Sequence, residues 1–253
     1  MAGRSRAAAA AEAHYRRISR LAEMREGELA EALAAEPAAW IESAARYGVV
    51  EAQARLGQLL LDGEGVARDA AAALAWFERA AAQGSAEAMN MVGRCLENGW
   101  GRAVDLPAAA ASYRRAAEAG LDWGEYNYAN LLFDGRGMAQ DQAEACAWYA
   151  KAAAQGHARG INLLARCCEE GWGVPRDPAA ARDWYRRSAE AGYFRAQYNH
   201  ATLLAAEGRV GDAIGWFKRA LTGAPSDARD AMVEALAQHP VERIAALARP
   251  VAA

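Results

Sequence analysis

The sequence predicts an all-α protein, an α-solenoid built from antiparallel helix hairpins, and two observations carry this prediction. The first is composition: alanine dominates the 53% hydrophobic fraction, and alanine is the best helix former because it loses no side-chain entropy in a helix. The second is a motif of glycines, an aspartate and aromatic residues that recurs every 36 residues. A fixed period between about 20 and 50 residues is typical of stacked repeats.

The period is carried by residues of the same type at equal intervals along residues 51–193. The paired loop glycines are Gly63 and Gly65, Gly99 and Gly101, Gly135 and Gly137, and Gly171 and Gly173. The other series are Asp69, Asp105, Asp141 and Asp177; Phe77, Tyr113, Tyr149 and Tyr185; and Gly84, Gly120, Gly156 and Gly192. A series of Trp76, Ser112, Trp148 and Trp184 is broken only by the serine.

Each unit is predicted to be a helix, a turn and a second helix. The first loop glycine ends the first helix because glycine tolerates the left-handed backbone, and the second lets the chain reverse closely. The aspartate then caps the second helix. Pro178 after Asp177 fits the first helical position, and Glu144 three residues after Asp141 resembles a capping box.

Small residues in the first helix predict close packing between the helices. They also recur every 36 residues, as Gly57, Gly93, Ala129, Ala165 and Ala201. We expect them to let the two helices of a hairpin approach, with the large aromatics of the second helix filling the gaps between neighbouring hairpins. One hairpin cannot bury its apolar face alone, but a stack can.

This combination of motifs resembles the Sel-one-like repeat (SLR), a relative of the tetratricopeptide repeat. The matching features are Leu56-Gly57, the Gly-x-Gly loop, the aspartate, the Trp-Phe or Trp-Tyr pair and the closing glycine. The resemblance covers about residues 51–193. It implies a right-handed superhelical stack used for protein-protein interaction or complex assembly, without chemistry of its own. Some cysteine-rich secreted relatives carry a disulfide pair in every repeat and a hydrolase-like activity. This sequence lacks those cysteine pairs.

The repeats and their edges predict a division of the chain. Trp216 follows Trp184 by only 32 residues because the Gly-x-Gly loop is missing, so the last unit reverts to a tetratricopeptide-like turn. The predicted parts are a disordered or frayed N-terminus (1–13), a degenerate N-terminal repeat or cap (14–50), four Sel-one-like repeats (51–85, 86–121, 122–157 and 158–193), a terminal repeat (194–225) and capping helices (226–253).

Composition and motifs argue against several function classes. The net charge is −3, with basic and acidic residues interspersed, whereas nucleic-acid binding needs a concentrated basic face. No run approaches the roughly 20 apolar residues of a membrane helix, and the N-terminus has no signal-peptide core. The four cysteines form no CxxC motif, which favours reduced thiols in a bacterial-type cytoplasm. No residue pattern indicates a metal, a cofactor or a catalytic site.

The partner-binding residues are predicted from the first helices, because in the related tetratricopeptide superhelix these helices line the concave face. The predicted contact residues are Asn90, Arg94, Trp123, Tyr126, Asn130, Phe133, Arg159, Asn162, Arg166, Arg195 and Tyr198. Amides can pair with a peptide backbone, arginines with carboxylates, and aromatics bury area at low entropy cost. We expect a peptide or partner helix to lie along this face; the alternative is a solvated polar surface.

The predicted function is a non-catalytic adaptor or scaffold that binds a protein or peptide as a monomer. One alternative is a hydrolase-like activity, as in some cysteine-rich relatives of the family. The other is a self-associating structural module, because residues 230–248 carry enough apolar side chains to dock a second copy. Capping of the stack is the other role for that segment, and we favour it. Trp100 and Trp172, between the loop glycines, are either exposed contacts or packed on a neighbouring loop. We favour packing.

Overall fold

The computed structural model describes residues 38–248, and within this range every regular element is helical. The helices are α3 (Ala38–Arg46), α4 (Val50–Asp62), α5 (Ala70–Ala82), α6 (Ala86–Asn98), α7 (Leu106–Glu118), α8 (Asp122–Asp134), α9 (Gln142–Ala154), α10 (Ala158–Glu170), α11 (Pro178–Glu190), α12 (Phe194–Ala206), α13 (Val210–Gly223), α14 (Ser226–Ala237), α15 (Glu242–Ala245) and the 3₁₀ helix η1 (Ala246–Ala248). The predicted frayed segment 1–13 and the first helix of the degenerate repeat lie outside the described residues.

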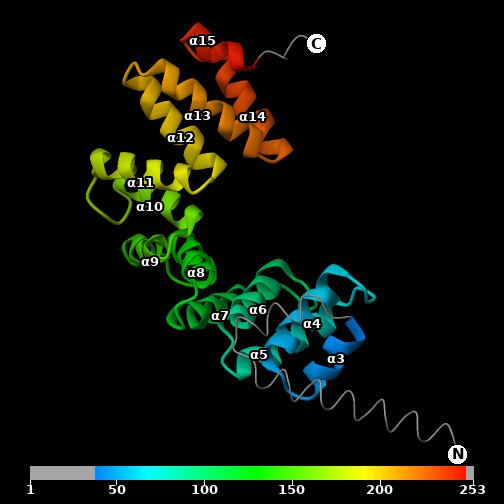
Figure 1. Cartoon of the computed structure of the whole chain (residues 1–253). Helices are drawn as coiled ribbons and strands as arrows, with labels where there is room; N and C mark the ends of the chain where they lie inside the picture. The colour runs from blue at the N-terminus through cyan, green and yellow to red at the C-terminus, as the bar shows by residue number, and fades with distance from the viewer. Residues whose placement is uncertain (1–37, 249–253) are drawn as a thin grey trace, which may run out of the picture. The chain divides into compact units, whose positions relative to one another are not determined.

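The helices pair in chain order as antiparallel hairpins, α4 with α5, α6 with α7, α8 with α9, α10 with α11 and α12 with α13 (Figure 1). Both helices of the four strong repeats are 13 residues long. The predicted all-α solenoid with a 36-residue period is confirmed. The chain forms two compact units, one ending at Gly120 and one beginning at Leu121, and we describe each by itself. None of the helices within residues 38–248 combines the length and apolar character that a bilayer crossing requires.

The helix ends follow the predicted cap chemistry. Gly99 ends α6 with a φ of 72°, in the left-handed region, and its N–H donates to the Cys95 carbonyl. Asp105 then accepts a hydrogen bond from the backbone N–H of Ala108 at 3.0 Å. At α9 the Asp141 carboxylate likewise accepts from the N–H of Glu144 at 2.9 Å.

The capping box predicted at Asp141 and Glu144 is only half formed. Its reciprocal bond would run from the backbone N–H of Asp141 to the Glu144 carboxylate. That N–H instead donates to the Leu132 carbonyl, and the Glu144 carboxylate accepts from the Trp148 indole N–H at 3.2 Å.

In two of the repeats the second loop glycine sits where a neighbouring hairpin leaves no room for a side chain. A Cβ on Gly101 would lie 2.2 Å from the Ala70 carbonyl oxygen, and one on Gly173 would lie 2.3 Å from the Gln142 carbonyl oxygen. Ala70 and Gln142 are the first residues of the second helix in the preceding repeat. The loop therefore packs directly on backbone, and only glycine permits this approach.

The aromatic residue of the second helix packs inside its own hairpin, which corrects the expectation that it fills the gap to the next one. A Cβ on Gly93 would lie 2.6 Å from the Tyr113 ring, and one on Gly57 would lie 2.7 Å from the Phe77 ring. Both rings are about 1% exposed. The preceding tryptophan of the first repeat, Trp76, instead packs against a cluster that includes residues of the preceding helix α3. The tryptophan therefore contributes to the gap between neighbouring hairpins, since its cluster combines residues of α3 with residues of its own first helix α4.

The C-terminal helices cover the end of the stack. Leu236 of α14 and Ile244 of α15 are fully buried in one cluster with Phe217 of α13 and Leu204 of α12. Pro240 lies in the break between α14 and α15. Val241 and Leu247 pack against the same cluster, so these apolar side chains of the segment pack within the chain.

Gly101→Ala tests the contact between loop and helix, with Gly84→Ala as its matched control. Both positions have a positive φ, 79° and 100°, so each alanine costs about 1–2 kcal/mol for the left-handed backbone. A Cβ at Gly84 meets no atom within 4 Å. We therefore expect urea denaturation to show roughly 1–3 kcal/mol more destabilisation for Gly101→Ala. Equal losses for the two variants would contradict a contact that requires glycine.

Candidate interaction surface

The predicted contact residues of the second unit come from the first helices α8, α10 and α12. Trp123 is 42% exposed, and the arginines Arg159, Arg166 and Arg195 are exposed as well. The residues Tyr126, Asn130, Phe133 and Tyr198 are half-buried. In the first unit Arg94 is exposed. We call this side of the hairpins the first-helix face.

Aromatic rings of the first-helix face of the second unit are connected into a row through the buried ring of Tyr149 in α9. The ring of Trp123 lies 6.0 Å from that of Tyr126, which lies 6.4 Å from Tyr149. Tyr149 lies 6.5 Å from Phe133, and Phe133 lies 5.2 Å from Trp172. The row follows α8 from its first turn to its last, and it ends on the loop after α10. Such a row offers apolar area together with polar ring edges.

The exposed arginines of this face are held by aromatic rings instead of carboxylates. The guanidinium of Arg159 lies 5.3 Å from the Trp123 ring, that of Arg166 lies 4.8 Å from the Trp172 ring and that of Arg94 lies 5.3 Å from the Trp100 ring. Among the described residues, none of these arginines forms a salt bridge, whereas Arg102 and Arg182 on other surfaces pair with glutamates at 3.0 Å. Stacking orients the guanidinium and leaves its N–H donors available.

Two carboxylates, each three residues after an arginine of this face, accept hydrogen bonds from buried tyrosines. The Tyr113 hydroxyl donates to the Glu97 carboxylate at 2.7 Å, and the Tyr185 hydroxyl donates to Glu169 at 2.6 Å. Burial, followed by the hydrogen bond with Glu169 and its charge, raises the pKa of Tyr185 well above the usual range, so the hydroxyl keeps its proton. Among the predicted contact residues of the second unit, the arginines are the charged groups.

Two predicted contact residues, Asn90 and Asn162, lie inside the structure, which corrects the predicted Asn-Arg stripe. They are 8% and 4% exposed. The Asn162 amide oxygen accepts a hydrogen bond from the Asn199 side chain of the next hairpin at 3.2 Å. Asn130, half-buried, uses its amide oxygen to accept from the Tyr149 hydroxyl at 2.7 Å. The asparagine amides thus stabilise hairpin packing, and the arginine four residues after each buried asparagine reaches the surface.

The loop tryptophan Trp172 lies at the first-helix face, a placement that its repeat position alone does not predict. It is half-buried between Phe133 and Arg166, so it packs on the preceding repeat and also borders the surface. With other residues of α8, α9 and α10 it lines a cavity of about 220 Å³. A signal was present in the sequence: Trp100 and Trp172 both follow an arginine by six residues, whereas the other two loops pair Gln58 with Glu64 and Asn130 with Arg136.

The cysteines and histidines contribute packing. Cys95 and Cys167 are fully buried, and burial raises the pKa of the Cys95 thiol to about 11. His200 is 7% exposed, and its ring lies 5.4 Å from that of Trp216. No group of histidine, cysteine or acidic side chains that could hold a metal ion occurs in the described part of the chain.

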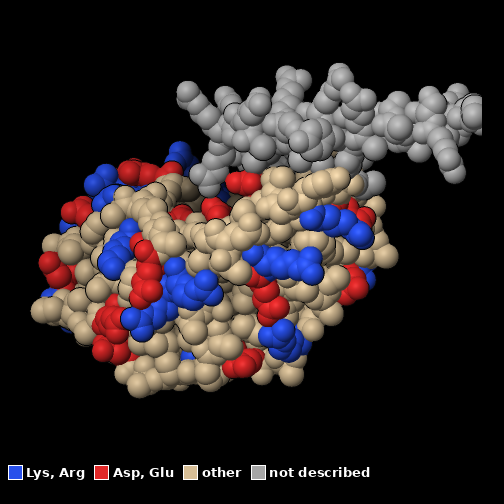
Figure 2. Space-filling model, turned by 90° about the horizontal axis from the view of Figure 1, so that it is seen from below, with Lys and Arg blue, Asp and Glu red and all other residues tan. Residues whose placement is uncertain are grey.

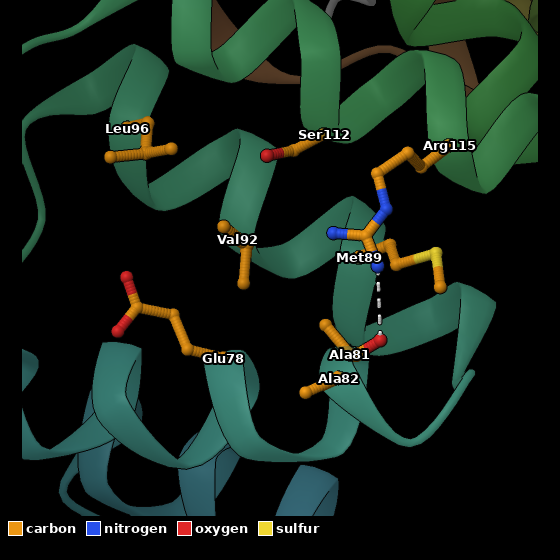
Figure 3. A pocket seen from close by; sticks show the side chains of 8 residues that line it. All are labelled: Glu78, Ala81, Ala82, Met89, Val92, Leu96, Ser112 and Arg115. Atoms are coloured by element: carbon orange, nitrogen blue, oxygen red, sulfur yellow. Dashed lines mark hydrogen bonds between the residues drawn. The ribbon is translucent and has the colours of Figure 1, made fainter.

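Charge on the molecular surface is mixed. In the view of Figure 2, lysine and arginine side chains alternate with aspartate and glutamate side chains. A separate cavity of about 370 Å³ lies in the first unit between α5, α6 and α7 (Figure 3), and none of the predicted contact residues lines it.

Comparison with known proteins identifies relatives of the repeats. The family model described as Sel1 repeat matches residues 50–85, 86–121, 124–157 and 158–193. Among solved structures, a Sel1 repeat protein from Oxalobacter formigenes is 28% identical with a TM-score of 0.66, and the match covers 72% of this chain and 75% of that one. A search of curated proteins found no match.

Two further structures extend the comparison. A protective antigen present in uropathogenic Escherichia coli strains, which displays an SLR fold, is 26% identical with a TM-score of 0.68 over 87% of this chain. The match spans about half, 48%, of that protein. An immunity protein from Pseudomonas aeruginosa is 14% identical with a TM-score of 0.52, over 79% of this chain and 80% of that one. This last likeness concerns the fold alone.

His157 makes the stability of this region depend on pH. It caps α10 by accepting the backbone N–H of Gly160 on Nδ1 at 3.0 Å, and its ring lies 4.5 Å from that of Trp123. Burial lowers the pKa of His157 below the usual 6.5, with Asp122 opposing and Arg159 adding to this effect. The folded protein therefore disfavours the protonated ring, which cannot accept the cap hydrogen bond.

We expect this stability to be complete above pH 6.5 and to fall as the pH drops from 6.5 through the lowered pKa, because the unfolded chain takes up the proton first. His157→Ser, which copies the Ser85 cap of the second repeat, should flatten the pH dependence of unfolding measured between pH 7 and 5. Burial also lowers the pKa of His200. We therefore expect part of the pH dependence of unfolding to remain in His157→Ser and to be reduced by His200→Leu. An unchanged slope in His157→Ser would refute this role.

Proposed function

Because the chain belongs to the Sel1 repeat family, we propose that it is a non-catalytic adaptor that binds a peptide or partner protein on the first-helix face of its hairpins. Sel1 repeat proteins generally mediate protein-protein interaction. Fold alone does not assign a function, however. The proposal therefore rests on the chemistry of this face.

The observation that carries the proposal is the set of stacked arginines without carboxylate partners beside a row of aromatic rings. Arginine and aromatic residues dominate the energetics of protein interfaces because they combine large contact area with directional polar groups. Arg159 and Arg166 are already oriented by Trp123 and Trp172, so a partner would pay little additional side-chain entropy for their order. Their free N–H groups match carboxylate or carbonyl oxygens of a bound segment.

We propose that the chain acts as a monomer, with self-association as the alternative. The support is the use of Leu236 and Ile244 in the interior, packed with Phe217, which leaves the terminal helices in the role of a cap. None of the four cysteines forms a disulfide, which supports a reducing compartment such as the cytoplasm. Buried cysteines and a buried His200 support a role without catalysis.

Affinity capture with mass spectrometry, comparing two matched double variants, tests the proposal. Arg94→Ala with Arg166→Ala removes a stacked arginine from the first-helix face of each unit. Arg79→Ala with Arg187→Ala removes one stacked arginine from a second helix of each unit, where the guanidiniums lie 4.6 Å and 4.4 Å from Trp76 and Trp184. The two double variants change the net charge equally.

We expect proteins captured by the wild type to bind the first double variant at least about tenfold more weakly, since interface arginines commonly contribute more than 1 kcal/mol each. The second double variant should capture them as the wild type does. Unchanged capture by the first double variant, or an equal loss in both, would remove the first-helix face as the binding site.

A further inference from the structure

The tryptophan series of the second helices has one vacancy, and the structure has a cavity there. Trp76, Trp148 and Trp184 occupy equivalent positions, and Ser112 stands in their place in α7. Ser112 lines the cavity of about 370 Å³ between α5, α6 and α7 (Figure 3). A serine side chain is far too small to fill the volume that an indole ring takes in the sister repeats.

The lining of the cavity corresponds to the surface on which the other tryptophans lie. Val92 and Leu96 of α6 line it. In the first repeat the counterparts of these residues are Leu56 and Leu60, which belong to or pack against the same apolar cluster as Trp76. The cavity therefore lies where a tryptophan ring lies in the sister repeats, and we call it the tryptophan seat.

In the third and fourth repeats the tryptophan ring also lies at the position that corresponds to this cavity. The counterpart of Val92 in the third repeat is Tyr128, and its ring lies 5.6 Å from that of Trp148 in an edge-to-face contact. The counterpart of Leu96 in the fourth repeat is Cys168, which packs with Trp184 against one cluster. In every repeat that has the tryptophan, its ring therefore lies by the residues that correspond to the cavity lining.

The cationic side chain of Arg115 also lines the tryptophan seat. Three residues after each tryptophan, Arg79, Lys151 and Arg187 place their charge 4.6, 3.4 and 4.4 Å from the indole ring. Arg115 holds this position in α7, and without a ring to cover it donates to the Ala81 carbonyl at a long 3.3 Å (Figure 3). That carbonyl also accepts from the backbone N–H of Gly84, so it stays bonded if Arg115 turns away.

We propose that this cavity binds a planar aromatic group of the indole class. The ring lies against Met89, Val92 and Leu96, the Arg115 guanidinium stacks on its face, and the Glu78 carboxylate accepts its N–H. Glu78 lines the cavity and pairs with Arg102 at 3.0 Å, which leaves lone pairs for a second donor. The chemistry selects an aromatic ring over an aliphatic group because cation-π attraction needs a π face.

This site is independent of the first-helix face. It lies on α5, α6 and α7 of the first unit, and its lining shares no residue with the proposed contact residues. A ligand here and a partner on the first-helix face can therefore be tested separately.

Titration with indole, followed by protein NMR on the full chain, tests the proposal. For a ligand of this size we expect saturable binding with a Kd on the order of 1 mM. Ser112→Trp supplies the missing ring and should abolish indole binding, whereas Ser112→Ala leaves the seat open and should retain it. The absence of saturable binding to the wild type, or equal binding by Ser112→Trp, would overturn the proposal.

A second pair of variants keeps the test decisive if Ser112→Trp does not fold. Arg115→Ala should weaken indole binding several-fold, and Arg79→Ala, an arginine already stacked on Trp76, should leave it unchanged. Ser112→Trp that folds should melt at a higher temperature than the wild type because it fills the cavity.

N-acetyl-tryptophanamide distinguishes the source of the aromatic group. Its binding with an affinity like that of indole assigns the seat to a protein's tryptophan side chain, and its exclusion assigns the seat to a free small molecule. Failure of both probes overturns the site.

Discussion

The contact between a loop glycine and the backbone of the preceding hairpin is the constraint on which the stack depends. Gly101 and Gly173 lie so close to the carbonyl oxygens of Ala70 and Gln142 that a Cβ would overlap them. Within each unit this approach fixes the position of one hairpin on the hairpin before it. Equivalent residues of neighbouring hairpins within a unit therefore come to lie side by side, and a 36-residue period in sequence becomes a repeated spacing on a surface.

Because of that spacing, a substitution at one repeat position is matched by a substitution at the position that it contacts. In the second and fourth repeats this position is a tyrosine, and its hydroxyl donates a hydrogen bond to a glutamate of the first helix, Tyr113 to Glu97 and Tyr185 to Glu169. The first repeat replaces both members at once, with Phe77 facing Leu61 in place of the tyrosine and the carboxylate. In the third repeat Phe133 takes the acidic position, and the Tyr149 hydroxyl turns to Asn130. That replacement also lets Phe133 join the aromatic row, which links core packing to the candidate surface.

The same reasoning separates architecture from function in the repeat. Cap aspartates, loop glycines and buried aromatics are equivalent in all four strong repeats because backbone geometry and hairpin packing demand them. The stacked Arg-Trp pairs and the serine at position 112 vary between repeats, and no requirement of the fold explains them. Variable positions of this kind are where a solenoid acquires specificity, since they change the surface without disturbing the stack.

The sequence by itself determined the helices, their caps, the hairpin pairing and the first-helix arginines, because these follow from local backbone chemistry and a strict period. Only the tertiary structure showed that Asn90 and Asn162 are buried, that Trp172 borders the first-helix face and that Ser112 leaves a cavity. The burial of each of these positions depends on which side chain of the neighbouring hairpin packs against it. Periodicity along one chain cannot show that contact, because it assigns a residue to a face without giving the depth at which neighbours cover it.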